Sequence, residues 1–396
     1  MKVLLVDVNC KAGSTGKIVY DIYSYLRKNG HQAAICFGRG ELVNEPDIYK
    51  FSSDLEVYFH AAMTRLTGLT SCFSFFATRR LIRFIEEYKP DIVHLHDLHG
   101  YFINIIPLMN FLKKRKIKTI WTFHCEFMYT GKCGHSYDCE KWKAQCGRCP
   151  EKREYPASLF FDFSKHMLKK KKKAFEGFND LIITAPSQWL VKRVGQSFLR
   201  DKKNEVVRNG VDTDVFRPHD ITVIKNKFIT AASDRVILHV SSNFQDANKG
   251  GKYVLELARR LPEVRFIIVG NKAPLNNLPS NVIAVGRTKD QHELALYYAL
   301  ADLFLITSRC ENFPTVCLEA LCCGTPIIGF TGGGTSETAP DGYGRFVSFG
   351  DVDALKKQAE LALTGTTRSK AECALFGSVE YDRDNMAERI VKLYLS

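Results

Sequence analysis

Short apolar runs rich in β-branched residues alternate with amphipathic stretches along nearly the whole chain. This alternation limits the possible folds more than any other feature, because it is typical of parallel sheets covered by helices on both faces. The sequence therefore predicts an α/β fold with two doubly wound units. The predicted strands are residues 2–8, 32–38, 91–97, 118–124 and 180–187 in the first unit, and 235–242, 265–270, 282–287, 303–307, 326–330 and 344–348 in the second.

The length of 396 residues suits two domains. Residues 206–218 read VVRNGVDTDVFRP, and the Asn209-Gly210 turn and the closing Pro218 are typical of a connection between domains. We therefore predict an N-terminal Rossmann-like domain over residues 1–205 and a C-terminal one over residues 206–375. Open α/β sheets bind ligands beyond the carboxyl ends of their strands, so the loops that follow strands hold the functional candidates.

The N-terminus reaches Asp7 after a few apolar residues, which predicts a buried strand and not a signal peptide. No run approaches the roughly 18 uncharged apolar residues of a membrane-spanning helix. We therefore expect a cytoplasmic protein with reduced cysteines. The net charge is +13, and residues 1–200 carry the whole excess. Such a basic half attracts anionic lipid, nucleic acid or acidic substrates.

The segment RCENFPTVCLEALCCGTPIIGF, residues 309–330, is the most informative. Glu311 lies on a loop after a predicted strand, Pro314 suits the first turn of a helix, and Glu319 lies inside that helix. Amides at the helix N-terminus can hold a phosphate oxygen, and the carboxylates can accept hydrogen bonds from sugar hydroxyls. The arrangement suits a nucleotide sugar. The alternative is that Glu311 is an exposed loop residue and Glu319 a solvated helix position.

The chain resembles the retaining glycosyltransferases of family 4. Their signature is two glutamates separated by seven residues, followed by a small-residue helix end and an apolar strand. The resemblance extends over almost the whole chain, because residues 206–218 look like the family's linker, residues 122–124 contain its histidine, and Lys249-Gly250 contain its lysine. The signature positions matched here are Glu311, Glu319, Ala320, Gly324, Pro326 and Ile327.

The resemblance implies the GT-B fold, in which two doubly wound domains face each other across a cleft. The first domain would hold the acceptor and the second a nucleotide-diphosphate sugar. The helix predicted over residues 381–395 would pack back on the first domain, so we assign residues 376–396 to that role. Sugar transfer would retain the anomeric configuration and need no cofactor or metal, with the leaving phosphate deprotonating the acceptor.

The resemblance also implies roles for single residues. Glu311 would contact hydroxyls of the transferred sugar, Glu319 the nucleotide ribose, and Lys249 the diphosphate. His124 is the last residue of a predicted strand and could hydrogen-bond a sugar hydroxyl or stabilise the charge that develops near the anomeric carbon. A packed core histidine is the alternative for His124, and a surface lysine is the alternative for Lys249.

Other donor contacts are predicted on neighbouring loops. The family usually has a basic residue just after the strand that precedes Lys249, but this chain has neutral Asn243 there, and Arg287 is our candidate for compensation or base contact. Residues 12–17 are not a nucleotide-triphosphatase loop, because Lys11 and Ile18 stand where that motif requires Gly and Ser or Thr. The remaining predicted donor-site residues are Gly16, Phe313, Pro314, Thr315, Gly332 and Gly333.

A Cys-rich insertion is predicted over residues 125–155. Four thiolates from Cys133, Cys139, Cys146 and Cys149 could close a structural zinc site, although the first pair is spaced too widely for the common pattern. Free thiols and disulfides are the alternatives. His94 and His96 lie on one face of a predicted strand, where a metal pair is conceivable, but an interior strand favours a structural role.

A lysine run covers residues 169–173, after an aromatic stretch. A solvated helix face is one explanation, and attachment to an anionic membrane surface is the other. We expect a saccharide or lipid-linked acceptor, work in bacterial surface polysaccharide biosynthesis, and a peripheral position on the inner face of the membrane. The alternative is a nucleic-acid-binding protein with a zinc-type cysteine cluster. It leaves the two-glutamate motif unexplained, so we expect no nucleic acid partner.

Overall fold

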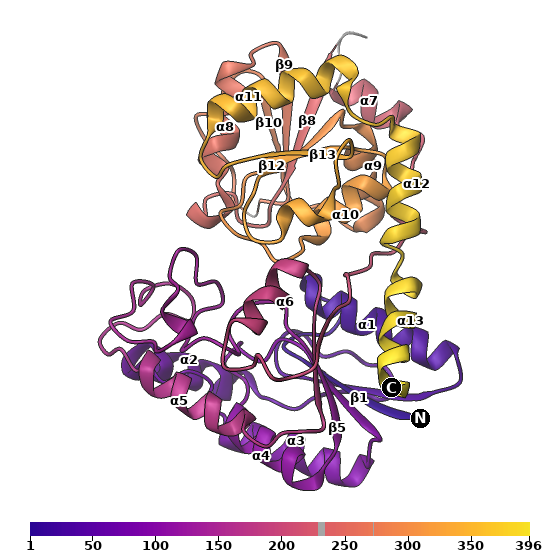
Figure 1. The fold of residues 1–396 in the computed structure, drawn as a ribbon. Helices are drawn as coiled ribbons and strands as arrows, with labels where there is room; N and C mark the ends of the chain where they lie inside the picture. The colour runs from indigo at the N-terminus through magenta and orange to yellow at the C-terminus, as the bar shows by residue number, and fades with distance from the viewer. Residues whose placement is uncertain (229–233, 272) are drawn as a thin grey trace. The chain divides into compact units, whose positions relative to one another are not determined.

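A computed structural model describes residues 1–228, 234–271 and 273–396. They form two compact units, of which unit 1 contains Met1–Arg208 and Met386–Ser396, and unit 2 contains Asn209–Asn385 (Figure 1). The first crossing lies within a few residues of the expected boundary after residue 205. The chain returns to unit 1 at Met386, later than the expected residue 376.

The late return has a physical cause in α12 (Lys370–Glu380). This helix belongs to unit 2, where it buries Cys373. It also packs so closely on α10 (Thr315–Cys322) that a Cβ on Gly377 would lie 2.6 Å from the backbone nitrogen of Cys322. Residues 376–385 therefore belong to unit 2, and only the segment from Met386 packs with unit 1.

Unit 1 is built on a parallel sheet in the order β3-β2-β1-β4-β5-β6-β7. Its central strands are almost entirely buried, as their apolar sequences predict. The two edge strands, β3 and β7, have only three residues each and were not predicted. The strands are β1 (Lys2–Asp7), β2 (Gln32–Phe37), β3 (Ile48–Lys50), β4 (Ile92–Leu95), β5 (Lys118–Thr122), β6 (Leu181–Ala185) and β7 (Asn204–Val206).

Helices cover both faces of this sheet. On one face α1 and α13 bury their apolar sides against alternate strand residues such as Val3 and Leu5, and on the other α3, α4, α5 and α6 pack against Leu4 and Val6. The helices of unit 1 are α1 (Gly13–Lys28), α2 (Asp54–Thr67), α3 (Phe75–Tyr88), α4 (Ile105–Arg115), α5 (Ser164–Phe175), α6 (Gln188–Gly195) and α13 (Arg383–Leu395, whose first residues belong to unit 2), with a 3-10 turn η1 (Lys141–Lys143).

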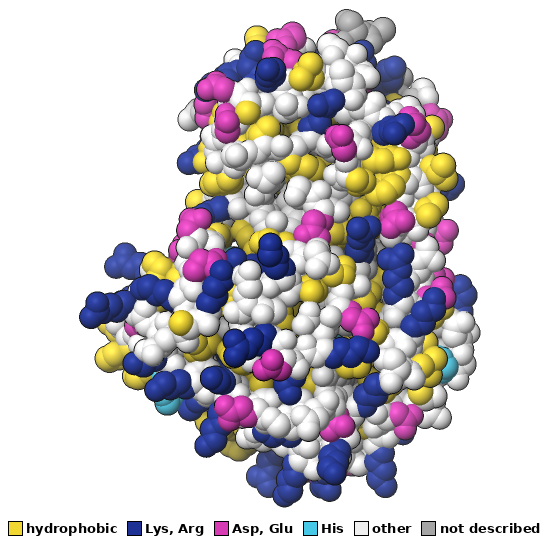
Figure 2. All heavy atoms as spheres, in the orientation of Figure 1, with side chains coloured by type: hydrophobic (Ala, Val, Ile, Leu, Met, Phe, Trp, Pro, Cys, Tyr) yellow, Lys and Arg dark blue, Asp and Glu magenta, His cyan; other side chains and the backbone are white. Residues whose placement is uncertain are grey.

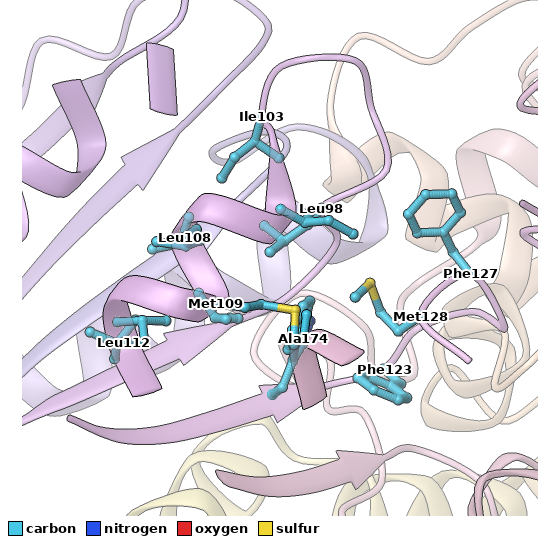
Figure 3. Close-up of a cluster of buried hydrophobic side chains, with 14 of the residues drawn as sticks. Leu98, Ile103, Leu108, Met109, Leu112, Phe123, Phe127, Met128 and Ala174 are labelled. Carbon is cyan, nitrogen blue, oxygen red and sulfur yellow. The ribbon is translucent and has the colours of Figure 1, made fainter. Parts of the chain in front are cut away.

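Figure 3 shows part of the core on the α4 side of the sheet. Residues 125–163, which lie between β5 and α5, contain the predicted insertion and are called the Cys-rich segment below. The first apolar residues of this segment are buried beside helices α4 and α5 and so form part of this core. The labelled side chains are Leu98, Ile103, Leu108, Met109, Leu112, Phe123, Phe127, Met128 and Ala174.

Helix α13 is tied to the sheet by a buried polar chain. The Tyr394 hydroxyl is hydrogen-bonded to His94 Nδ1 at 2.7 Å, and His94 Nε2 is hydrogen-bonded to Thr122 Oγ1 at 2.7 Å. Burial lowers the pKa of His94 to about 3, so the ring is neutral. Both ring nitrogens are therefore engaged, which supports the structural role over a metal pair with His96.

Unit 2 has a parallel sheet in the order β10-β9-β8-β11-β12-β13. Alternate strand residues again face opposite layers: α8 and α11 bury one set, and α7, α9, α10 and α12 bury the other. The strands are β8 (Arg235–Val240), β9 (Val264–Val269), β10 (Val282–Val285), β11 (Leu303–Ile306), β12 (Ile327–Phe330) and β13 (Gly344–Val347). The other helices are α7 (Thr222–Phe228), α8 (Gly251–Arg260), α9 (Gln291–Leu300) and α11 (Val352–Leu361), with short turns η2 (Ala247–Lys249), η3 (Thr335–Thr338) and η4 (Ala362–Thr366).

Within the described ranges, no helix combines the length and the apolar character that crossing a membrane requires.

Candidate active site

Three loops of unit 2 meet where the neighbouring strands β8, β11 and β12 end. The backbone holds them together: Arg309 N donates to Asn248 O at 2.8 Å, Glu311 N to Gly332 O at 3.2 Å, and Gly334 N to Glu311 O at 2.8 Å. Adjacent parallel strands place their carboxyl ends at one sheet edge, so this meeting follows from the topology.

Lys249 and Glu311 form an ion pair at this edge. Lys249 Nζ lies 2.7 Å from Glu311 Oε1, and the two side chains are 40% and 20% exposed. The Glu311 carboxylate raises the pKa of Lys249 and so further favours the charged form of the lysine. The backbone beside it is tightly placed: Gly250 has φ of +70°, and a Cβ there would lie 2.1 Å from Thr307 O. Lys249 is therefore a partly exposed lysine that is held in an ion pair.

Helix α10 presents its N-terminus on the loop that carries Glu311. Pro314 is the N-cap and provides no side-chain cap, and the helix begins at Thr315, so Pro314 lies just before the first turn and not inside it. Phe313 is buried, and its carbonyl accepts a hydrogen bond from Asn209 Nδ2 at 3.0 Å. The N-terminus is thus held in place and left without a side-chain acceptor, which is a suitable arrangement for an anion.

Glu319 lies inside α10 and is only 6% exposed. Its Oε2 accepts a hydrogen bond from the buried Tyr298 hydroxyl at 2.8 Å. The solvated-helix alternative for Glu319 is therefore wrong, and so is the exposed-loop alternative for Glu311.

The two glycines predicted after β12 are explained by close packing. A Cβ on Gly332 would lie 2.4 Å from Arg309 O, and Gly333, at φ +68°, would place one 2.2 Å from Glu311 O. They are therefore required to bring the β11 and β12 loops together. Any larger residue would push Glu311 away from its present position.

Asn243 and Arg287 lie on different loops. Asn243 is exposed on the loop that leads to Lys249, and its carbonyl accepts a hydrogen bond from Asp246 N at 3.2 Å. Arg287 is exposed after β10, an edge strand that β9 separates from β8. The sheet order thus places Asn243 with Lys249 and sets Arg287 two strands away.

In unit 1, His124 lies two residues beyond the end of β5, whereas we predicted it inside the strand. Its ring stacks on His96 with centroids 5.4 Å apart, and His124 Nε2 is 3.1 Å from His96 Nδ1. Burial lowers the pKa of His124, so it is a neutral hydrogen-bonding group. Gly16 lies in α1, where a Cβ would be 3.2 Å from the backbone of Asn9.

A cluster beside His124 escaped the sequence analysis. Ligand atoms of Asp97, His99 and Cys125 all lie within 4.8 Å of one another. Asp7 is nearby and fully buried, and its burial together with the Asp97 charge raises the pKa of Asp7 to about 7. Asp7 is the last residue of β1, Asp97 and His99 follow β4, and Cys125 follows β5, so the order of these neighbouring strands alone could have indicated their proximity.

The four cysteines of the insertion line one pocket. The Cys133 and Cys149 thiols share a hydrogen bond, and this bond and the nearby Lys132 charge lower the pKa of Cys149 to about 7 against the opposing effect of burial. No disulfide joins them. Across the described ranges, Asp97, His99 and Cys125 are the only three such ligands that lie within 4.8 Å of one another, so no three of the four sulfurs are that close.

These features define a class of protein: two Rossmann-like units, with a lysine, a glutamate and a helix N-terminus at the carboxyl end of the second sheet, are the architecture of a GT-B glycosyltransferase. The family model described as Glycosyltransferase Family 4 matches residues 15–215, and the one described as Glycosyl transferases group 1 matches residues 220–373. The chain belongs to glycosyltransferase family 4.

Individual proteins resemble the chain over its full length. It is 23% identical to WcaC of Escherichia coli (strain K12), a candidate colanic acid biosynthesis glycosyl transferase, over 100% of this chain and 99% of that protein. Among solved structures it is similar to sucrose-phosphate synthase of Thermosynechococcus elongatus, with a TM-score of 0.71, 16% identity and coverage of 100% and 98%. It is also similar to Anabaena HepE in complex with UDP, with a TM-score of 0.69, 17% identity and coverage of 99% of each chain. Such structural likenesses show the GT-B fold alone.

Proposed function

We propose that the chain transfers a sugar from a nucleotide-diphosphate sugar to a hydroxyl of a saccharide or lipid-linked saccharide, with retention at the anomeric carbon. The observation that carries the proposal is the Lys249–Glu311 pair beside the open N-terminus of α10. A cation and a helix N-terminus suit a diphosphate, and a carboxylate suits sugar hydroxyls. The family match favours this enzyme over the nucleic-acid-binding alternative.

In the proposed mechanism Lys249 turns from Glu311 to the diphosphate when the donor binds. The negative charge on the diphosphate grows as the sugar–phosphate bond breaks, so a fixed cation stabilises the transition state more than the ground state. Glu311, released from the lysine, accepts hydrogen bonds from the sugar. One carboxylate oxygen of Glu319 keeps its hydrogen bond from the Tyr298 hydroxyl, and the other accepts a hydrogen bond from a ribose hydroxyl. Lys249 and the α10 amides then supply the positive field that a divalent ion would otherwise supply.

The donor base and the biological role are inferred from relatives. HepE, a structural neighbour, was solved with UDP and with UDP-glucose, so we favour a uridine donor. WcaC is assigned to colanic acid biosynthesis, a Klebsiella pneumoniae relative of 24% identity is encoded in a cps region, and the structural neighbour WaaG takes part in lipopolysaccharide biosynthesis. We therefore place this chain in bacterial surface polysaccharide biosynthesis.

The test is a transfer assay with UDP-, GDP- and ADP-linked sugars and saccharide acceptors, with the product linkage read by NMR. We expect one donor class to give a product that keeps the donor's anomeric configuration, at a rate unchanged by added Mg²⁺ or Mn²⁺. An inverted product would contradict retention. A rate that depends on the added ion would contradict the role of Lys249 and α10 as its replacement.

We further propose that unit 1 rests on an anionic membrane surface, where a lipid-linked acceptor would be found. Large apolar side chains are exposed on α2, at the start of α3 and on residues 159–161, and contacts join these elements: Leu159 N donates to Arg65 O at 2.8 Å, and His60 Nδ1 lies 2.6 Å from Ser74 Oγ. Figure 2 shows many Lys and Arg side chains on the visible face of unit 1. The exposed apolar residues are Leu55, Tyr58, Phe59, Phe75, Phe76, Leu159, Phe160 and Phe161.

The adjoining helix α5 supplies the positive charge. Its buried side contains Met167 and Phe175, and also Lys171, so the lysine run is not a wholly solvated face. The other lysines of the run, at positions 169, 170, 172 and 173, are exposed. Exposed lysines beside apolar side chains are the combination that binds anionic bilayers.

We expect the protein to sediment with vesicles that contain phosphatidylglycerol and not with phosphatidylcholine vesicles. Each lysine near the surface adds about 1 kcal/mol, so the Lys172→Ala/Lys173→Ala variant should bind about 30-fold more weakly. Lys225→Ala/Lys227→Ala, at exposed positions of α7 in unit 2, is the matched control. Equal sedimentation with both vesicle types would contradict the membrane proposal and leave the transferase proposal standing.

A further inference from the structure

The Cys-rich segment, residues 125–163, has the single 3-10 turn η1 and no helix or strand. Despite this, much of it is buried: Trp142 is 2% exposed and Tyr129 is completely buried. A segment of this length without regular backbone pairing needs other cross-links to remain ordered. One such cross-link is polar, because Glu126 accepts hydrogen bonds from Arg193, Tyr129 and Ser136.

The second cross-link is the pocket that the four cysteines line. Cys133, Cys139, Cys146 and Cys149 are separated by up to 16 positions in the sequence, yet all four contribute to the same pocket wall. The remaining lining residues include Lys132, Lys141, Trp142 and Ser164. No carboxylate or histidine is among the lining residues. The only metal ligands at the pocket are therefore four soft sulfur atoms.

Polar groups around the pocket are arranged for negatively charged sulfurs. Lys132 is 3% exposed, and its three ammonium protons are directed to the carbonyl oxygens of Glu151, Lys152 and Glu154 at 2.7 to 3.2 Å. Its positive charge is therefore fixed beside the cysteines by the backbone.

Two hydrogen-bond donors at the same pocket have no acceptor. Trp142 Nε1 and Ser164 Oγ are buried without a hydrogen-bond partner, and both residues are 2% exposed. Burying a donor without a partner costs free energy, so such groups call for an explanation. Metal-bound thiolates would supply it, since sulfur ligands commonly accept hydrogen bonds from the groups around them.

We propose that Cys133, Cys139, Cys146 and Cys149 bind one Zn²⁺ ion as a structural site. The ion replaces four thiol protons, and the resulting tetrathiolate carries a net charge of −2 that the fixed Lys132 ammonium partly offsets. A tetrahedron with zinc–sulfur distances of about 2.3 Å requires sulfurs roughly 3.8 Å apart, so binding draws together thiols that already share a pocket. Four protein ligands leave no open position, so the ion holds the segment and takes no part in sugar transfer.

The test measures zinc and iron per chain by mass spectrometry on full-length protein purified without added metal. We expect about one zinc and no iron, a loss of zinc to below about 0.1 per chain in Cys149→Ser, and unchanged content in Cys72→Ser, a half-buried cysteine of the same unit outside the pocket. Cobalt exchanged into the wild-type protein should give the sulfur-to-metal charge-transfer bands of a tetrathiolate site. This spectrum is recorded on the wild-type protein, so it does not depend on the folding of any variant.

Three results would overturn the proposal: less than about 0.1 zinc per wild-type chain, stoichiometric iron, or zinc that persists in Cys149→Ser. A Cys125→Ser variant separates the two metal-ligand groups of unit 1. If Cys125→Ser lost its zinc and Cys149→Ser kept it, the ion would be assigned to Asp97, His99 and Cys125 instead. Proteolysis gives a second readout, because zinc removal should expose residues 125–163 to cleavage before the rest of unit 1.

Discussion

Lys249→Ala is expected to lower kcat/KM for sugar transfer by about 10²- to 10³-fold, the loss typical of removing one preorganised group that stabilises developing charge. Glu311 raises the pKa of Lys249, which favours its charged form, and the close packing of Gly250 against the Thr307 carbonyl fixes the backbone beside it. Steady-state kinetics with a fixed acceptor measure the effect. Because the cation acts most strongly on the leaving diphosphate, kcat should fall more than KM rises.

Lys252→Ala is the matched control for this variant. Lys252 lies three residues further along the same loop–helix junction, is exposed, and its Nζ lies 4.7 Å from the centroid of the Tyr253 ring. Its substitution should leave kcat/KM within about twofold, since surface substitutions usually have small effects. If Lys249→Ala reduced the rate no more than Lys252→Ala does, the diphosphate role of Lys249 would be wrong.

Arg193→Ala is expected to destabilise unit 1 by about 3–5 kcal/mol, because it leaves a buried carboxylate without its charge partner. Arg193 Nε lies 2.7 Å from Glu126 Oε1, and the two side chains are only 13% and 1% exposed. The guanidinium also donates to Ser136 Oγ at 2.7 Å and stacks over the Trp142 ring at 4.7 Å. The arginine thus joins α6 to the Cys-rich segment.

Urea unfolding followed by the circular dichroism signal measures this loss. The exposed neighbour Lys192 provides the control, since Lys192→Ala removes an equal charge from the same helix without touching Glu126. A loss below about 1 kcal/mol for Arg193→Ala, the range of surface ion pairs, would show that Glu126 is not held as a buried charge.

The central strands of both sheets could be predicted because they are buried on both faces and consist of apolar residues. The edge strands of unit 1, β3 and β7, could not: β7 contains Asn204 and Glu205, and its residues are half-buried, so no apolar run marks it. Several predicted strands also extended into the loops that follow them, as at His124. The apolar sequence continues beyond the last residue that pairs with the neighbouring strand, so it does not mark where the strand ends.

The candidate site divides in a similar way. Lys249 and Glu311 follow neighbouring strands, so their meeting across 62 positions was predictable from topology. The burial of Glu319 was not, because it depends on the Tyr298 hydroxyl from the neighbouring helix α9. Lys171 shows the same difficulty: in a run of lysines only the three-dimensional helix phase shows which one is buried. Asp97 and Cys125 form no motif in the sequence, and only the strand order brings them together.

The central claim is that unit 2 holds a nucleotide-diphosphate donor, and calorimetric titration of the full chain with UDP, GDP and ADP tests it most directly. The account predicts that one nucleotide, which we expect to be UDP, binds, that Lys249→Ala weakens this binding, and that Lys252→Ala leaves it intact. Glu319→Gln, which keeps an acceptor for Tyr298, should also weaken it through the ribose. No binding by any of the three nucleotides, or binding that survives Lys249→Ala unchanged, would contradict the account.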